Sequence, residues 1–379
     1  MDYSKRSIKL HQLKKGKIEI KSKVELKTKD DLSLAYTPGV AAVSSAIGID
    51  KKMSWQLTNR ANQIAIVSDG TAILGLGDLG PEAAMPVMEG KAILFKNFGN
   101  VDAIPLCINT TDTKEIINFC KLIEPSFGGI NLEDISAPRC FEILERLENE
   151  LSIPVFHDDQ DGTAIVVLAA LINACRVAKR DIKKLKIIVN GAGAAGISIT
   201  KLLINQSVAD IILVDSQGII YDNRSNLNEM KIKIAKQTNK YKIKGELKEA
   251  VIDRDVFIGV SRADLLKPEM IKTMAVHPII FAMANPNPEI MPDQALMAGA
   301  SIIGTGRSDF PNQINNALVF PGLFRGLLDQ QIRKITTEIK IKTANALANT
   351  IIPTKNKILP LLTDKKIVKA IVKAISNKL

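Results

Sequence analysis

One stretch restricts the fold of this chain more than any other: residues 185–206, with the sequence LKIIVNGAGAAGISITKLLINQ. An apolar run that suits a buried strand leads into a glycine-rich turn, and the pattern of an apolar helix follows. Gly191, Gly193 and Gly196 have G-x-G-x-x-G spacing, and the next apolar run, IILVD, ends in Asp215. Glycine spacing alone is weak evidence. A strand before it, a helix after it and an acid closing the next strand together indicate a dinucleotide-binding unit, with a tight turn in another α/β protein as the alternative.

The residue types in this turn suit that chemistry. Small residues let the N-terminus of the helix approach a pyrophosphate, and the acid can accept hydrogen bonds from an adenosine ribose. No basic residue adjoins Asp215, which favours NAD over NADP, although Arg224 lies nearby in the sequence. We therefore expect cofactor contacts from Gly191, Ala192, Gly193, Ala194, Ala195, Gly196 and Asp215.

Further apolar runs continue the pattern after this unit. VFIGVS, PIIFAMANPNPEI and ASIIGTGRSDFPNQINNA each pass from apolar residues to small or amide residues. Such endings are expected where the carboxyl ends of parallel strands line a ligand crevice. Asn285 and Asn315 are therefore candidates to hold cofactor or substrate. For Asn285, which is flanked by prolines, a turn-forming role is an equal alternative.

Two adjacent acidic pairs follow apolar leads in the first half of the chain. Glu133 and Asp134 end the run GGINLED, and Asp158 and Asp159 follow PVFH. Four acids brought together would repel one another unless a cation or raised pKa values relieved them. Oxygen ligands from two segments suit Mg²⁺ or Mn²⁺. Taken alone, the acids could instead be helix-start and turn residues.

The rest of the first half indicates an α/β region. QIAIVS and VDAIPLCINT suit strands, TKEIINFCKLIEP and CFEILERLENELS suit helices, and we expect a compact mixed sheet. The alternation of KIEIKSKVELKTK suits an exposed strand near the N-terminus. After Gly322 the pattern is helical and lysine-rich, with Pro353 and Pro360 as breaks.

Two single residues have both a chemical and a structural interpretation. Lys91 heads the apolar run of EGKAILFK; it could reach solvent along its own stem, or lose its proton in a desolvated site and act as a base. Tyr36 precedes a Pro-Gly turn; it could donate a proton or simply pack.

Composition excludes several protein classes. A chain of 379 residues is long enough for two domains, and its apolar runs are too short or interrupted for a membrane anchor. The net charge of +11 resides at the ends, with +7 in residues 1–29 and +9 in residues 331–379 around an acidic middle. Without interleaved aromatic residues, these ends suit a solvated surface better than nucleic acid. Four widely spaced cysteines and the lack of a leader pattern predict a reduced, cytoplasmic protein.

Several separated motifs coincide with one family. The chain resembles the short bacterial-type malic enzymes from about residue 16 to about residue 330. The motifs occur in the family's order: LAYTPGVA, SDGTAILGLGDLG, MPVMEGKAILFK, FGGINLEDI, PVFHDDQDGTA, NGAGAAG, MANPNPE and GRSDFPNQINNALVFPG.

The resemblance implies a role for each candidate residue. Lys91 becomes the general base, Tyr36 the general acid and Asp158 a neighbour that tunes the lysine. Asn285 and Asn315 would contact malate or the nicotinamide end, and Thr163 joins the cofactor contacts. The implied metal ligands are Glu133, Asp134 and Asp159. One departure stands out: Asp161 replaces a histidine that relatives usually carry, which adds an acid near the metal.

The resemblance also implies a fold and a reaction. We expect an α/β protein with an N-terminal mixed α/β catalytic domain (1–160), a Rossmann-type NAD(P)-binding domain (161–316) and C-terminal helices (317–379) that return to the first domain. A homodimer is expected from the family. The implied reaction is metal-dependent oxidative decarboxylation of L-malate to pyruvate and CO2 with NAD or NADP. A malolactic-type enzyme and a non-catalytic nucleotide or metabolite sensor are the alternatives.

Overall fold

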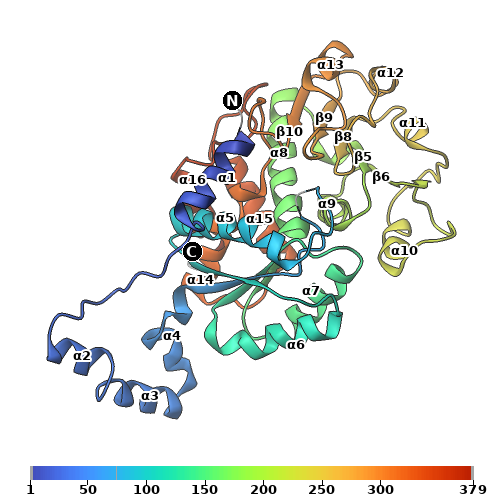
Figure 1. Ribbon diagram of the computed structural model, residues 1–379. Helices are drawn as coiled ribbons and strands as arrows, with labels where there is room; N and C mark the ends of the chain where they lie inside the picture. Colours follow the sequence, from blue (N-terminus) through green and yellow to red (C-terminus); the bar gives the residue numbers. More distant parts are fainter. Residues whose placement is uncertain (1–2, 74, 377–379) are drawn as a thin grey trace.

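The first of two sheets lies in the N-terminal half. The computed structural model describes residues 3–73 and 75–376 (Figure 1). This sheet has the order β2-β1-β3-β4 and is entirely parallel, so the expectation of a mixed sheet was wrong. The reason lies in the connections, since a helix in each one returns the chain to the same end of the sheet. The strands are β1 (Gln63–Ser68), β2 (Asp102–Cys107), β3 (Gly129–Leu132) and β4 (Val155–His157), and the helices between them are α5 (Pro81–Gly99), α6 (Thr113–Ile123) and α7 (Arg139–Glu150).

The second sheet has six strands in the order β10-β9-β8-β5-β6-β7, and only the short edge strand β7 is antiparallel. The chain passes from β5 to β6 on one side and later to β8 on the other. The switch point, where such sheets bind ligands, therefore lies between the carboxyl ends of β5 and β8. The strands are β5 (Lys186–Asn190), β6 (Asp210–Asp215), β7 (Gly218–Ile219), β8 (Val256–Gly259), β9 (Ile279–Ala282) and β10 (Ile302–Thr305).

Helices join and cover this second sheet. The apolar helix α8 (Thr163–Ala178) runs from the end of the first sheet toward the second and is almost entirely buried. The helices that follow are α9 (Ala194–Ile204), α10 (Glu229–Ala235), α11 (Leu247–Ala250), α12 (Pro268–Ile271) and α13 (Pro292–Met297).

The C-terminal helices pack back onto the first half of the chain, as expected. They are α14 (Phe320–Gln330), α15 (Thr337–Ala348) and α16 (Lys366–Ile375). Phe320 of α14 stacks at a ring distance of 4.6 Å on Phe95 of α5, and Phe324 meets Phe156 of β4 at 5.9 Å. This aromatic cluster fixes α5, and hence Lys91, against the end of the first sheet. The predicted breaks at Pro353 and Pro360 fall between α15 and α16.

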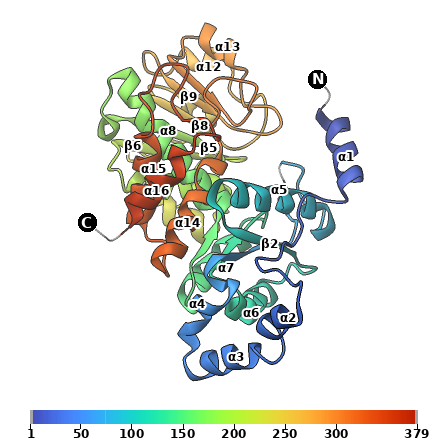
Figure 2. The same cartoon turned by 90° about the vertical axis from the view of Figure 1, so that its left-hand side faces the viewer.

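The N-terminal arm differs from the expectation. The segment predicted to be an exposed strand has no strand structure, because no neighbouring strand pairs with it. It follows helix α1 (Tyr3–Lys14) and leads to α2 (Lys29–Ala35) and α3 (Val40–Ile49), which bury no residue and extend away from the two sheets (Figures 1 and 2). The arm rejoins the body through α4 (Ser54–Leu57).

Two helical stretches, Lys29–Ile49 and Asp158–Ala178, are long and apolar enough to cross a membrane by length and composition alone. The second is 72% buried within the protein, as a core helix is. The first consists of two helices separated at Tyr36–Gly39. Neither is clear evidence of a membrane span.

Candidate active site

The two predicted acidic pairs meet at the ends of neighbouring strands. β3 and β4 pair in parallel with Leu132 opposite His157, so the acids that follow each strand emerge side by side. One carboxylate oxygen from each of three of them lies within 4.8 Å of the others; these three residues, here called the acid cluster, are Glu133, Asp134 and Asp159. The amide N–H of Asp134 also donates to Asp159 Oδ2 at 3.0 Å.

Lys91 contacts this cluster from helix α5. Its Nζ donates to Asp158 Oδ2 at 2.5 Å, forms an ion pair with Glu133, and lies 4.7 Å from the ring centroid of Phe320. The lysine is 7% exposed and does not reach solvent. Burial alone would lower its pKa, but the charges of Asp158, Glu133 and Asp159 outweigh burial and raise it. The role of Lys91 as a base beside a bound metal stays a prediction.

The pKa values of the carboxyl groups around Lys91 are also raised, but here burial is the largest cause. Burial raises the pKa of Glu133 to about 7, of Asp158 to about 7 and of Asp159 to about 6, against the attraction of Lys91. A divalent cation would relieve this crowding. Three convergent carboxylate oxygens are a donor set that fits Mg²⁺ or Mn²⁺.

Asp161 does not join the acid cluster. Its Oδ1 forms an ion pair at 2.7 Å with Lys340 Nζ of α15, and both side chains are largely buried. A cation from the C-terminal helices therefore balances the charge of Asp161.

The glycine-rich turn adopts the expected strand–turn–helix form. Gly191 has φ +120°, and α9 begins at Ala194 after Gly193. A side chain at Gly196 would collide with the carbonyl oxygen of Gly191, so only glycine allows this close packing. Ala192 lies in the turn, and Ala195 lies in the first turn of α9. Thr163 begins α8, directly after the turn that carries Asp158 and Asp159.

Asp215 ends β6 as predicted, but its carboxylate is fully engaged. Oδ1 accepts from Gln217 N at 3.0 Å and Arg224 Nη1 at 2.9 Å, and Oδ2 accepts from Arg224 Nη2 at 2.5 Å and Lys231 Nζ at 2.6 Å. Burial opposes its charge, yet the hydrogen bonds from Arg224 and Lys231 lower its pKa to about 2. Lys231 is a residue that sequence reasoning missed, because only the fold brings α10 to the end of β6.

The two candidate asparagines follow strands of the second sheet. Asn285 lies just after β9, and a Cβ on Gly75 of the first half would collide with its carbonyl oxygen. The two halves of the chain thus meet at Asn285. Asn315 caps a short helical turn (Asn316–Leu318), where its Oδ1 accepts from Ala317 N at 2.8 Å, so part of its side chain has a structural role.

Tyr36 is the one predicted site residue that the structure leaves apart from the others. It lies at the end of α2 in the N-terminal arm and is 66% exposed. The arm extends away from α5, so Tyr36 lies apart from Lys91 of the same chain (Figures 1 and 2).

Sequence reasoning also missed the residues that support the acid cluster. Arg139 Nη1 forms an ion pair at 2.9 Å with the buried Asp69, and Arg139 Nη2 donates to Thr71 Oγ1. Thr71 Oγ1 accepts from the N–H of Ser136, two residues after Asp134. Asp69 begins the DGT step of the SDGTAILGLGDLG motif, which was the available signal.

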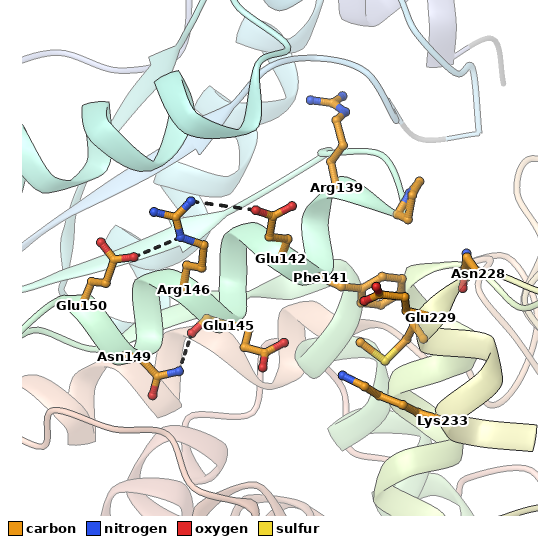
Figure 3. Close-up of a pocket in the computed structure, with 12 residues that line it drawn as sticks. Arg139, Phe141, Glu142, Glu145, Arg146, Asn149, Glu150, Asn228, Glu229 and Lys233 are labelled. Carbon is orange, nitrogen blue, oxygen red and sulfur yellow. Dashed lines mark hydrogen bonds and ion pairs between the residues drawn. The ribbon is translucent and has the colours of Figure 1, made fainter. Parts of the chain in front are cut away.

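A cavity of about 570 Å³ lies elsewhere, between α7 and α10 (Figure 3). Much of its charge is internally paired, since Arg146 contacts both Glu142 and Glu150. No residue of the acid cluster lines it. The cavity is therefore separate from the acid cluster.

Comparisons with known proteins agree with this arrangement. Residues 160–379 match the family described as malic enzyme, NAD binding domain, and residues 15–118 and 110–148 match malic enzyme, N-terminal domain. The chain is 52% identical over 381 residues to a bifunctional malic/malolactic enzyme of Bacillus subtilis, covering 100% of this chain and 93% of that protein. It is 52% identical over 363 residues to an NAD-dependent malic enzyme of Geobacillus stearothermophilus, covering 95% and 76%.

A solved structure shows the same architecture. The NAD-dependent malic enzyme of Thermotoga maritima superposes with a TM-score of 0.95 at 47% identity, covering 98% of this chain and 99% of that one. With both family domains matched and both relatives covered over most of their length, the chain belongs to the malic enzyme family, as an α/β oxidoreductase with an NAD-binding domain.

Proposed function

We propose that this protein oxidatively decarboxylates L-malate to pyruvate and CO2 on a divalent metal, with NAD or NADP as hydride acceptor. One observation carries the proposal: a buried lysine contacts two carboxylates beside three convergent carboxylate oxygens. A hydroxy acid needs these groups, namely a base for its hydroxyl proton and a cation that polarises the same oxygen.

Each side chain then has a task. Glu133, Asp134 and Asp159 would hold Mg²⁺ or Mn²⁺, which would polarise the hydroxyl and offset the acid charges that keep Lys91 protonated. Lys91 takes the hydroxyl proton as hydride leaves C2, and Asp158 holds its ammonium group in place. Asn285 and Asn315 orient malate or the nicotinamide. Loss of the C4 carboxylate then leaves a carbanion equivalent at C3 that needs a proton.

We assign that protonation to Tyr36, and this assignment requires a second copy of the chain. Helices α2 and α3 bury no residue and expose Leu32, Leu34 and Tyr36. An apolar surface of this kind suits an interface, and a homodimer would cover it. The proposed dimer would bring the phenol of one copy to the acid cluster of the other.

The cofactor preference rests on the surroundings of Asp215. The carboxylate has four lone-pair directions, and four donors occupy them, so a ribose hydroxyl must displace one. Arg224 also donates to the carbonyl oxygens of Gly218 and Ile219, which leaves Lys231 as the donor able to move. We infer that the protein uses NAD. Lys231 would also permit the use of NADP, because its ammonium group could pair with the 2′-phosphate of that cofactor.

A malolactic reaction, from malate to lactate and CO2, is a second candidate. The observation in its favour is the 52% identity to a bifunctional malic/malolactic enzyme. Incubation with malate, Mn²⁺ and NAD decides between them: NADH and pyruvate accumulate in the proposed reaction, whereas lactate without NADH would favour the second.

The four free cysteines suit the reducing cytoplasm, where we place the protein.

A further inference from the structure

One buried carboxylate joins the two loops that follow β8 and β9. Glu289 is 0% exposed. Its Oε1 accepts from the N–H of Ser261 and its Oε2 from the N–H of Ala284, each at 3.0 Å. Ser261 follows β8 and Ala284 follows β9, so each oxygen serves a different loop.

The surrounding chain is shaped to admit this carboxylate. A Cβ built on Gly259, the last residue of β8, would collide with the carboxyl group of Glu289. Asn190, which ends β5, donates from Nδ2 to Ser261 Oγ at 2.9 Å. The carboxylate therefore ties together the ends of β8 and β9 and, through Ser261, the end of β5.

These strand ends border the crevice where the dinucleotide belongs. Gly191 of the glycine-rich turn packs against the carbonyl group of Val260, one residue before Ser261. Asn285, the candidate contact for the nicotinamide end or malate, directly follows Ala284. If Ser261 or Ala284 lost its hydrogen bond to Glu289, the backbone of that loop would shift, and with it the surface that faces the cofactor.

The burial of a carboxylate in this position is costly. Burial raises the pKa of Glu289, and the facing backbone amides oppose that rise by stabilising the charge. The acid cluster does not include Glu289, so metal binding does not explain its presence. Its presence is explained by the two backbone N–H groups, which would otherwise be buried without an acceptor.

We propose that Glu289 is a positioning residue for the nicotinamide half of the cofactor. It holds the β8 and β9 loops in one register so that Asn285 meets the nicotinamide. The proposal rests on the proposed function, because it assumes that the dinucleotide lies at the switch point of the second sheet.

The test separates cofactor chemistry from metal chemistry. Glu289→Gln keeps the shape but places an NH2 group against one N–H donor. Its KM for NAD should rise about tenfold or more, with weaker NADH binding by fluorescence titration. Decarboxylation of oxaloacetate with Mn²⁺, which needs no hydride transfer, should stay within about twofold of wild type. Glu269→Gln, an exposed carboxylate on α12 of the same domain, should change neither activity.

Other variants keep the proposal open to contradiction. Gly259→Ala displaces the carboxylate from the other side and should reproduce the NAD defect, including when Glu289→Gln fails to fold. An unchanged KM for NAD and unchanged NADH binding in these variants would overturn the proposal. An equal fall of both activities would also overturn it, because that pattern indicates a general structural role. NADH binding still reports on Glu289 if the wild-type protein fails to oxidise malate, so failure of the proposed function is distinguishable.

Discussion

Lys91 Nζ and Asp158 Oδ2 lie 2.5 Å apart in the buried interior of the first half of the chain. Asp158 is 0% exposed and Lys91 is 7% exposed, so neither charge has water as an alternative partner. A buried ion pair is weak evidence for stability, because desolvation offsets much of the attraction. Because this pair lies beside three convergent carboxylates, we interpret it as holding the lysine in position for proton transfer.

Replacing Lys91 tests that interpretation. Lys91→Ala should reduce malate oxidation by a factor on the order of 100 to 10,000, because the base is lost, while Mn²⁺ binding persists. Steady-state rates and Mn²⁺ titration measure the two effects. Lys96→Ala, on the same helix but 54% exposed and paired with Asp102, should leave the rate near wild type. Near-normal turnover of Lys91→Ala would remove the lysine from the mechanism.

The role of Tyr36 makes a prediction about two chains. Tyr36→Phe should slow turnover by a factor on the order of 100, because it lacks the acidic hydroxyl. Mixing this variant with Lys91→Ala under conditions that exchange subunits should restore part of the activity, since a hybrid dimer holds one complete site. Activity assays of the mixture against each parent give the answer. If no activity returns although hybrids form, Tyr36 does not act across the dimer.

The pair between Asp161 and Lys340 predicts non-additive stability. Lys340→Met leaves a buried carboxylate unpaired and should lower the free energy of unfolding by about 1–3 kcal/mol. Adding Asp161→Asn to Lys340→Met should cost less than the sum of the two single changes. Denaturant unfolding of the four proteins measures the coupling. Strict additivity would show that the ion pair does not balance Asp161.

Lys231 predicts a change in cofactor choice. Lys231→Met frees one lone pair of Asp215 and removes a cation, so it should raise kcat/KM for NAD and lower that for NADP, shifting their ratio by about tenfold or more. Initial rates with both cofactors measure the ratio. Lys233→Met, on the same helix but facing the cavity between α7 and α10 (Figure 3), is the matched control. A ratio that moves equally in both variants would contradict the assignment.

Local patterns in the sequence predicted much of the fold and of the site. The G-x-G-x-x-G turn and the acids after GGINL and PVFH lie at strand ends, where a short stretch of sequence largely determines the geometry. The two acidic pairs converge because the strands that precede them, β3 and β4, are neighbours in one sheet. The family resemblance, now confirmed, added the link between Lys91 and the acids, which no local pattern contains.

Other features depended on long-range partners. The strand predicted near the N-terminus had the right alternation but no neighbouring strand, and Tyr36 lies in the same arm. Asp161 was expected to add negative charge near the metal. Its ion pair with Lys340 could not be foreseen, because the two residues are distant in the sequence. The fully parallel first sheet followed from the helical crossovers and not from the strand patterns themselves.

The most direct test of the account is the position of the metal. Crystals grown with Mn²⁺ should give one strong anomalous scattering peak per chain, about 2.1–2.3 Å from carboxylate oxygens of Glu133, Asp134 and Asp159. A peak bound to other groups, or no peak at these three side chains at saturating Mn²⁺, would contradict the central claim that they hold the catalytic cation.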